Sequence, residues 1–287
     1  MAITLLVSVA DQVQKFWAPM FEDELREKTV LPSLVSKKYD GEIKPGGSTV
    51  RVSQVNEPTA TTAVVGAGHQ NFTTSTLTTQ YIEIAANRVI SAAYELDDLI
   101  ALQSQLGAQE SSIRTAMLKS VEKALNNYLY SLVASTVTVS GVTDFNAAQV
   151  NNLRKEASQA YWPEDGRILL LDPSYMSDLL AATQMVSGDF VPDGPTVGGK
   201  VAMQRFGFTV IEDNSFGMNE VSPTNQTEDL GLAFHPDFMH LVMGAPEFKL
   251  SDSHSNGRFA YTLSVRLICG ASLGNDGADK HIQIYNT

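Results

Sequence analysis

The stretch "ESSIRTAMLKSVEKALNNYLYSLVAS", residues 110–135, carries the clearest periodic pattern of the sequence, and the other segments are interpreted around it. Its apolar residues recur at spacings of three and four, the period of one helix face. These residues are Ile113, Met117, Val121, Ala124, Leu125, Tyr128, Leu129 and Leu132. We predict an amphipathic helix of roughly six turns, whose apolar face another element must cover. A shorter helix is predicted before it, within "ELDDLIALQSQLG" (residues 95–107), ending at Gly107.

The segment that precedes these helices is rich in threonine and almost uncharged. Its sequence is "EPTATTAVVGAGHQNFTTSTLTTQ", residues 57–80. Threonine favours extended backbone, and Gly66-Ala67-Gly68 supplies a tip, so we predict a long hairpin that returns through residues 78–91. Two strands cannot bury a core alone, so this hairpin is expected to lie on another surface. A solvated or disordered insertion is the alternative.

The chain enters this hairpin through "YDGEIKPGGSTVRV", residues 39–52. A phosphate-binding glycine loop follows a buried strand and opens a helix, whereas this glycine pair lies between alternating segments. We predict that Gly46-Gly47 turns the preceding segment into the first strand of the hairpin. Residues 11–38 have apolar residues at helical spacings, interrupted at Pro19 and Pro32, which predicts an arm with one or two short helices.

The chain after Gly141 alternates between helical and strand patterns. The segments "NAAQVNNLRKEASQAYW" and "PSYMSDLLAATQM" predict helices, the second with Pro173 in its first turn. Strands are predicted in "RILLLD", "KVAMQRFGFTVIEDN", "DLGLAFHPDFMHLVMG", "RFAYTLSVRLICGASL" and "KHIQIYN". This mixture indicates an α+β fold.

Composition excludes several classes of protein. The 287 residues carry a net charge of −12, which is unfavourable for a protein that wraps nucleic acid. A single cysteine, Cys269, excludes an internal disulfide, and its apolar surroundings predict an inert buried thiol. No signal peptide or membrane-spanning apolar run is evident, so we expect a soluble protein made in a reducing compartment.

The chemical motifs do not support an enzyme. The loop "GPTVGGKV", residues 194–201, has the glycine and lysine spacing of a phosphate-binding loop, but Val201 replaces the hydroxyl that would ligate magnesium. His235 and His240 are predicted on opposite faces of a strand, and Asp97-Asp98 in the first turn of a helix. The other acidic pair, Glu212-Asp213, has no second carboxylate that the sequence places near it. We predict no catalytic, cofactor or metal site.

Five phrases, taken in order, carry a resemblance to a known family. Two lie near the N-terminus: Trp17, Phe21, Glu24-Leu25 and Leu31, followed by Tyr39, Gly41, Ile43, Gly46, Val50 and Val52. The others are "YIEIAANRVISAAYELDDL", "GRILLLDPSYMSDLL" and "GKVAMQRFGFTVIEDNS". Their order resembles the major capsid proteins of tailed bacteriophages, which share the Hong Kong 97-like shell fold.

The resemblance implies four parts. They are an N-terminal arm (1–50), an extended β-hairpin loop (51–92), a peripheral domain with a long spine helix (93–142 and 251–287) and an axial α/β domain (143–250). Some members of the family crosslink through a lysine of the extended loop, but this chain has no lysine between Lys44 and Lys119. An N-terminal scaffolding segment and a dedicated insertion domain are also not expected.

The resemblance implies a structural coat protein, not an enzyme. It would assemble through pentamers and hexamers into an icosahedral shell around the phage double-stranded DNA, located in the virion and assembled in the host cytoplasm. Expected partners are other copies, a scaffolding protein, portal and decoration protein, with non-specific DNA contact and no membrane. Residues expected at the assembly interface are Phe16, Trp17, Phe21, Val64, Val65, Phe72 and Leu77. Alternatives are an encapsulin-like compartment shell and a nucleotide-binding enzyme that uses the 194–201 loop.

Overall fold

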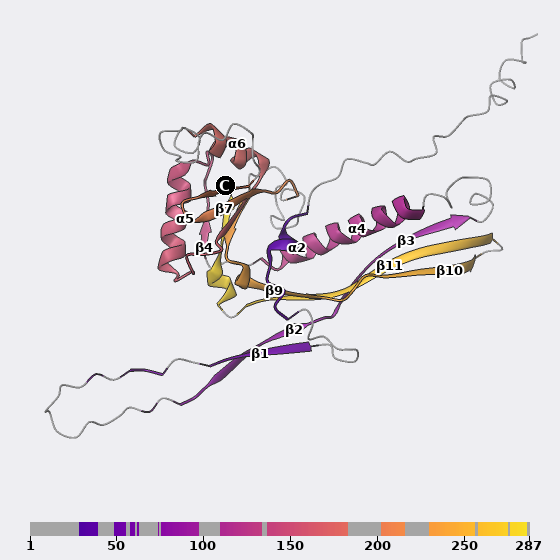
Figure 1. Cartoon of the computed structure of the whole chain (residues 1–287), viewed down its shortest axis with the longest axis horizontal. Helices are drawn as coiled ribbons and strands as arrows, with labels where there is room; N and C mark the ends of the chain where they lie inside the picture. Colours follow the sequence, from indigo (N-terminus) through magenta and orange to yellow (C-terminus); the bar gives the residue numbers. More distant parts are fainter. Residues whose placement is uncertain are drawn as a thin grey trace, which may run out of the picture.

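The long helix α4, Glu110–Ser131, lies along an antiparallel sheet in the computed structural model of the chain (Figure 1). The structure describes residues 29–39, 49–55, 58–60, 62, 74, 76–97, 110–133, 137–182, 202–215, 230–255, 258–274 and 276–285. The sheet has the order β10-β11-β3, and β9 pairs with the other end of β11. These strands are β3 (Arg88–Asp97), β9 (Met239–Met243), β10 (Glu247–Ser255) and β11 (Arg258–Leu273).

The apolar face of α4 is buried against this sheet, as predicted. Met117, Val121, Leu125 and Leu129 follow one another at intervals of four and are each at most 4% exposed. They belong to one core cluster with residues of β11, namely Leu263, Val265 and Leu267. Ala124 is exposed instead, because it lies about 100° around the helix from Leu125.

The shorter helix predicted at residues 95–107 is wrong for its first three residues. Strand β3 continues through Glu95, Leu96 and Asp97, which pair with Thr262, Tyr261 and Ala260 of β11. Asp97 therefore lies in a strand and not in the first turn of a helix. Backbone pairing with β11 overrides the local helical pattern, and residues 98–109 lie outside the described residues.

A second, six-stranded sheet has the order β4-β12-β8-β5-β7-β6. Its strands are β4 (Val137–Val139), β5 (Ile168–Leu171), β6 (Ala202–Arg205), β7 (Phe208–Glu212), β8 (Leu230–Phe234) and β12 (His281–Tyr285). Helices α5 (Ala147–Gln159) and α6 (Pro173–Ala181) begin at side-chain caps, Asn146 and Asp172. The helices and strands predicted after Gly141 are confirmed, except that a 3-10 turn at Pro236–Phe238 divides the segment "DLGLAFHPDFMHLVMG" into two strands.

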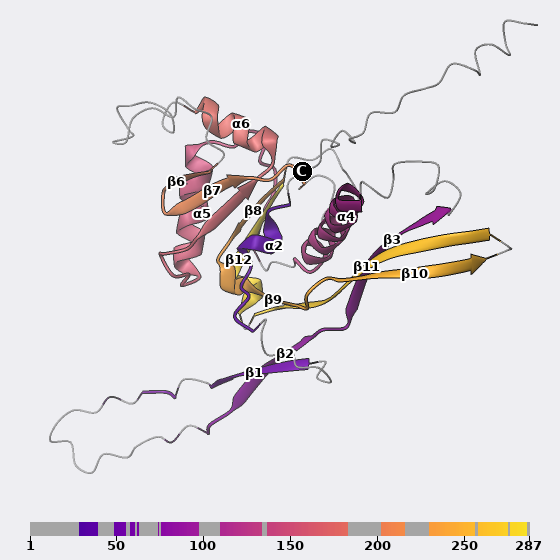
Figure 2. The same cartoon turned by 45° about the vertical axis from the view of Figure 1, so that its right-hand side comes forward.

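The six-stranded sheet is buried on both faces. Leu169 and Leu171 of β5 join the core cluster that includes residues of α5 and α6. Ile168 and Leu170 point the other way and join the cluster around α4. This explains why all four residues of β5 are apolar and buried. The two sheets are therefore parts of one connected body (Figure 2).

Strands β4 and β12 lie in the six-stranded sheet, although the predicted domain boundaries assign both to the part that contains the long helix. Strand β12 pairs in parallel with β4 and antiparallel with β8. Between β8 and β9 the chain forms the 3-10 turn η4 (Pro236–Phe238), and before β12 it forms η5 (Gly277–Lys280). The domain division itself stays a prediction.

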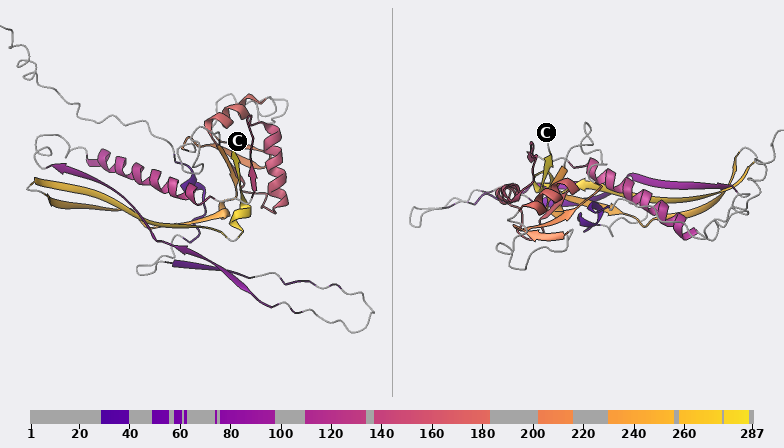
Figure 3. Two further views of the ribbon diagram at one scale, coloured as in Figure 1. Left: turned by 180° about the vertical axis from the view of Figure 1, so that it is seen from behind. Right: turned by 90° about the horizontal axis from the view of Figure 1, so that it is seen from above.

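The predicted hairpin forms an antiparallel pair of its own, but its predicted return through residues 78–91 is wrong beyond Ala85, because Arg88–Asp97 form β3 and pair with β11 instead. Strand β1 (Thr49–Val55) pairs with β2 (Thr79–Ala85) along its whole length, and Figure 3 shows the pair beside the sheet of α4. Val50 and Ile84 are buried together with Val242 of β9, which fixes the base of the hairpin to the body. The predicted turns at Gly46-Gly47 and Gly66-Ala67-Gly68 lie outside the described residues.

Backbone contact holds the hairpin in place beside β11. A side chain at Gly270 would collide with the backbone of Ala85 and Ala86, so only glycine permits this close approach. The last part of the predicted arm is also held by the body. Its short helix α2 (Leu31–Leu34) begins around Pro32 and buries Leu31 in the core of α4, while residues 1–28 lie outside the described residues.

Changing Gly270 tests this contact. Gly270→Ala is expected to displace the hairpin and lower the free energy of unfolding by about 1–3 kcal/mol, since backbone must move to admit the methyl group. Denaturant unfolding measures the loss, and limited proteolysis measures release of the 49–85 segment. Gly244→Ala is the control, because its new methyl group would lie 3.7 Å from its nearest neighbour. Equal stability of the two variants would contradict the prediction.

Candidate assembly surfaces

The outer face of the β1–β2 hairpin is an apolar strip without cover from the described part of the chain. Residues along the two strands alternate between a face that packs on the body and a face turned outward. Three large apolar side chains of the outer face are exposed: Val55 (57%), Tyr81 (61%) and Leu77 (71%), which lies two residues before β2. We call these three residues the hairpin strip.

A charged pair borders the hairpin strip. Arg51 and Glu83 are cross-strand partners, and their side chains approach within 2.5 Å. The Arg51 guanidinium also lies 5.2 Å from the centre of the Tyr81 ring. Because this ion pair is exposed, it contributes only about 0–1 kcal/mol to stability. The pair therefore places charged groups beside an apolar surface.

A second exposed apolar pair lies on the sheet under α4. Val89 of β3 and Ile268 of β11 are direct partners, with exposed fractions of 62% and 40%. They lie on the face opposite α4, since the alternate residues Leu267 and Cys269 are buried. This pair is therefore a second candidate contact surface for another protein chain.

Only one of the residues predicted at the assembly interface can be placed. Leu77 is the most exposed residue of the hairpin strip. The other six, Phe16, Trp17, Phe21, Val64, Val65 and Phe72, lie outside the described residues. The structure adds Val55, Tyr81, Val89 and Ile268 as exposed candidates that the sequence reasoning did not name, and the interface itself stays a prediction. The alternation within "TVRVSQV" and "TQYIEIA" is the signal that separates the outward face from the buried one.

A buried polar network joins the end of β7 to α4. The fully buried carboxylate of Asp213 accepts hydrogen bonds from the Tyr130 hydroxyl (2.6 Å) and from the Ser215 amide (2.9 Å) and hydroxyl (2.6 Å). Ser215 Oγ in turn accepts from Asn126 Nδ2 at 2.9 Å. Burial, followed by the charge of Asp213 and its hydrogen bond, raises the pKa of Tyr130 well above its ordinary value.

This network is suited to structural support and not to acid–base catalysis. Ser215 links the Asp213 carboxylate to the side-chain amide of Asn126 and so connects β7 with α4. Tyr130 stays protonated and donates to Asp213, which stabilises the buried charge. The network therefore fixes α4 against the six-stranded sheet.

The histidines near η4 do not lie on opposite faces of one strand, so that prediction is wrong. The turn η4 separates them: His235 caps η4, accepting from the Asp237 amide through Nδ1 at 3.3 Å, and His240 lies in β9. Burial lowers the pKa of both, Asp237 opposes this, and Lys38 and Lys280 lower it further. The pKa of His281, which donates to the Gly277 carbonyl, is also lowered by burial.

Other chemical features give no sign of a reactive site. Cys269 is buried as predicted, and burial raises the pKa of its thiol, with Arg88 opposing the shift. Among the described residues, no group of three potential ligands is placed to hold a metal ion. No helix in that part of the chain is long and apolar enough to cross a membrane. The loop at residues 194–201 lies outside the described residues.

Comparison with known proteins identifies the fold. No protein-family model and no curated protein sequence matches this chain. Solved structures do match over nearly the whole length. A structure of Mycobacterium phage Che8 has a TM-score of 0.74 at 17% identity, covering 95% of this chain and 96% of that one. The capsid of cyanophage P-SCSP1u has a TM-score of 0.72 at 14% identity, covering 96% and 94%.

The chain thus has the fold found in phage capsids. The capsid of cyanophage Pam1 has a TM-score of 0.74 at 11% identity, covering 99% of this chain and 98% of that one. The α+β shell fold inferred from the order of the sequence phrases is confirmed.

The Asp213 network predicts the effect of removing one hydroxyl group. Tyr130→Phe leaves a buried carboxylate one hydrogen bond short and is expected to lower the free energy of unfolding by about 1.5–3 kcal/mol. Denaturant unfolding measures the change. Tyr128→Phe on the same helix is the control, because its hydroxyl makes only long contacts with Ala271, donating to the carbonyl at 3.5 Å and accepting from the amide at 3.4 Å. A smaller loss for Tyr130→Phe than for Tyr128→Phe would contradict the assigned role.

Because burial lowers the pKa of His235, His240 and His281, we expect the free energy of unfolding to decrease in mild acid. A histidine whose pKa is lower in the folded state contributes stability that is complete above the unfolded pKa of about 6.5 and declines as pH falls through the folded pKa. Unfolding free energies measured between pH 7.5 and pH 5 should decrease, by up to about 1.4 kcal/mol per pH unit for each histidine. His281→Asn should reduce the slope, and an unchanged slope would show that His281 does not contribute.

Proposed function

We propose that this chain is a major capsid (coat) protein of a tailed bacteriophage, which self-assembles through pentamers and hexamers into an icosahedral shell around double-stranded DNA. The observation that carries the proposal is the hairpin strip: Val55, Leu77 and Tyr81 are exposed on a hairpin fixed to the body at its base. The phage capsid fold over nearly the whole chain supports the same function.

The hairpin strip has the character of a contact surface between copies. A two-stranded hairpin is only marginally stable alone, so an apolar outward face gains stability when a neighbour covers it. Exposed tyrosine is also enriched among residues that dominate binding energy. Contact between a hairpin and a different surface of the next copy is heterologous, and such contacts generate rings when the rotation closes.

Many modest contacts then stabilise a closed shell. A stable interface between two proteins buries roughly 1,600 Å² in total. A subunit with several neighbours distributes this requirement over several surfaces, and their effects reinforce one another once the ring is closed. The Val89–Ile268 pair offers one such additional surface.

Within this proposal the chain divides into four parts. Residues 1–50 form the arm, 51–92 the extended loop, 93–142 and 251–287 the peripheral domain, and 143–250 the axial domain. We move β4 and β12 into the axial domain, because both pair within its six-stranded sheet. The peripheral domain keeps α4 and β11.

The proposed partners follow from the same role. Other copies of the chain are the principal partners, with a separate scaffolding protein, a portal and a decoration protein in the complete particle. The net charge of −12 supports only local and non-specific contact with packaged DNA. The protein would be assembled in the host cytoplasm and reside in the virion, with no enzymatic activity or cofactor.

An encapsulin-like compartment shell is the alternative of the same structural class. The phage origin of the matching structures favours the capsid over it. The enzyme alternative would require the 194–201 loop to bind a nucleotide, although Val201 lacks the hydroxyl that ligates magnesium. Neither alternative has a feature among the described residues that favours it over the capsid.

Electron microscopy of the purified protein tests this function. We expect uniform shells or five- and six-membered rings, and in infected cells shells that protect DNA from nuclease. A Leu77→Ser/Tyr81→Ser double variant should raise the concentration needed for assembly by about tenfold or more, because it removes two exposed apolar contacts.

The control variant is Tyr161→Ser, which changes a tyrosine that is 94% exposed outside the hairpin. Equal assembly by the double variant and the control would remove the support from the hairpin strip. A persistent monomer that Mg-ATP stabilises would overturn the shell function and favour the nucleotide-binding alternative. Shells filled with an enzyme instead of DNA would favour the encapsulin-like alternative.

A further inference from the structure

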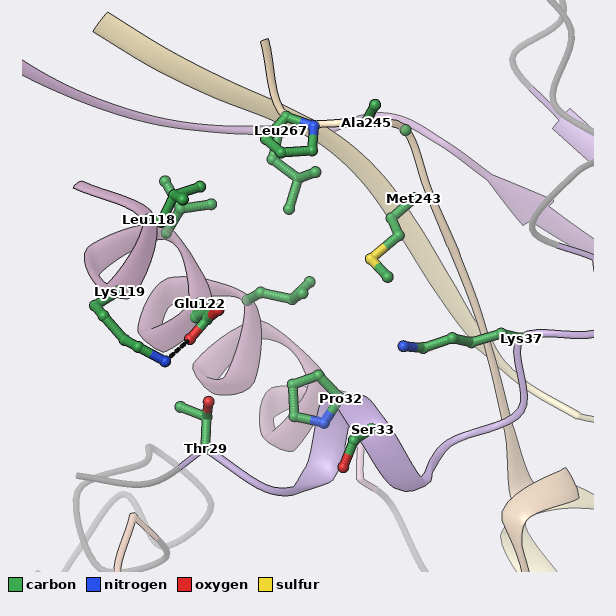
Figure 4. Close-up of a pocket in the computed structure, with 14 residues that line it drawn as sticks. Thr29, Pro32, Ser33, Lys37, Leu118, Lys119, Glu122, Met243, Ala245 and Leu267 are labelled. Carbon is green, nitrogen blue, oxygen red and sulfur yellow. Dashed lines mark hydrogen bonds and ion pairs between the residues drawn. The ribbon is translucent and has the colours of Figure 1, made fainter. Parts of the chain in front are cut away.

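An open groove of about 730 Å³ lies between α2, α4 and the turn from β9 to β10. Its lining is mainly apolar, with Pro32 from α2, Leu118 and Leu125 from α4, Met243 from β9 and Leu267 from β11 (Figure 4). This size is in the range of sites that bind a small molecule or a few side chains. Among the described residues, none covers this apolar surface beside the main core.

The rim of this groove is polar and carries an excess of positive charge. Its charged lining residues are Lys37, Lys119 and Glu122. Lys119 is engaged with Glu122 at 2.7 Å, whereas the amine of Lys37 is directed into the groove (Figure 4). An occupant with an apolar face and flanking carboxylates would match both the lining and Lys37.

The chain itself supplies a segment with these properties. Residues 19–28, "PMFEDELREK", contain four acidic and two basic residues, and Phe21 and Leu25 are four residues apart. That spacing places both apolar side chains on one face of a helix, with Pro19 at a favourable first position. The segment lies outside the described residues.

The point at which this segment joins the described chain also favours it as the occupant. Thr29, the residue that follows it, is itself part of the groove lining. Phe21 is eight residues from Thr29, a distance that spans about 12 Å as a helix and at most about 28 Å when extended. A short tether of this kind gives a millimolar effective concentration, which favours the segment of the same chain over any free partner.

We infer that residues 19–28 fold back on their own chain and fill the groove, with Phe21 and Leu25 on its apolar lining and acidic residues beside Lys37. The inference goes beyond the proposed shell function, since it concerns a contact within one chain and holds whether or not the chain assembles. In this arrangement the end of the arm packs against α4.

A disulfide trap in dilute, unassembled protein tests this contact. In Phe21→Cys/Ser33→Cys, mild oxidation should form an intrachain disulfide, because Ser33 lines the groove. Non-reducing electrophoresis and intact mass measure it. Native Cys269 is buried and is left in place. Phe21→Cys/Thr143→Cys is the matched control, since the exposed Thr143 lies next to the six-stranded sheet and away from the groove.

Two further variants keep the test decisive. Leu25→Cys/Ala245→Cys, which uses a second lining residue, should crosslink if the first pair disturbs folding. Lys37→Glu should lower the intrachain yield by about threefold, whereas Lys249→Glu on exposed β10 should not. Absence of an intrachain disulfide from both cysteine pairs overturns the inference. Disulfides only between chains would also overturn it, by showing that a second copy supplies the occupant.

Discussion

Backbone pairing along β11 is the constraint on which the other elements depend. Its sixteen residues pair with β10 and β3 over the first part and with β9 over the last. Its inward side chains Leu263, Val265 and Leu267 pack against α4. Gly270 near its end allows the hairpin backbone to approach closely. Because one strand serves both purposes, the position of the hairpin is fixed relative to the long helix. A break in β11 would uncouple them.

The parts of the fold that follow from local periodicity could be predicted from the sequence. Spacings of four in Met117, Val121, Leu125 and Leu129 indicate α4 because a helix must bury one face, and the apolar run in β5 indicates a strand buried on both faces. The capsid fold was predicted from the order of several sequence phrases, each of which is weakly specific. Each phrase alone could be produced by other folds, whereas their common order reflects one chain topology.

Features that depend on distant parts of the chain could not be predicted in this way. Asp213 and Tyr130 are 83 residues apart, so the sequence shows a paired carboxylate but not the hydroxyl that it binds. Pairing with β11 kept Glu95–Asp97 extended against a helical pattern. Within the hairpin strip, Leu77 is also one of the interface residues proposed from the sequence, whereas the outward position of Tyr81 required the strand register.

The direct continuation of the hairpin into the sheet has a mechanical consequence. Strand β2 ends at Ala85 and β3 begins at Arg88, so only two residues separate the hairpin from a strand that pairs with β11 at ten positions. Tension applied along the hairpin is transmitted to those pairs as shear, and they resist it together because their hydrogen bonds run perpendicular to the strand. Tension across the strands would instead open the pairs one after another. The hairpin is thus attached to the body in the orientation that best resists a pull along its own strands.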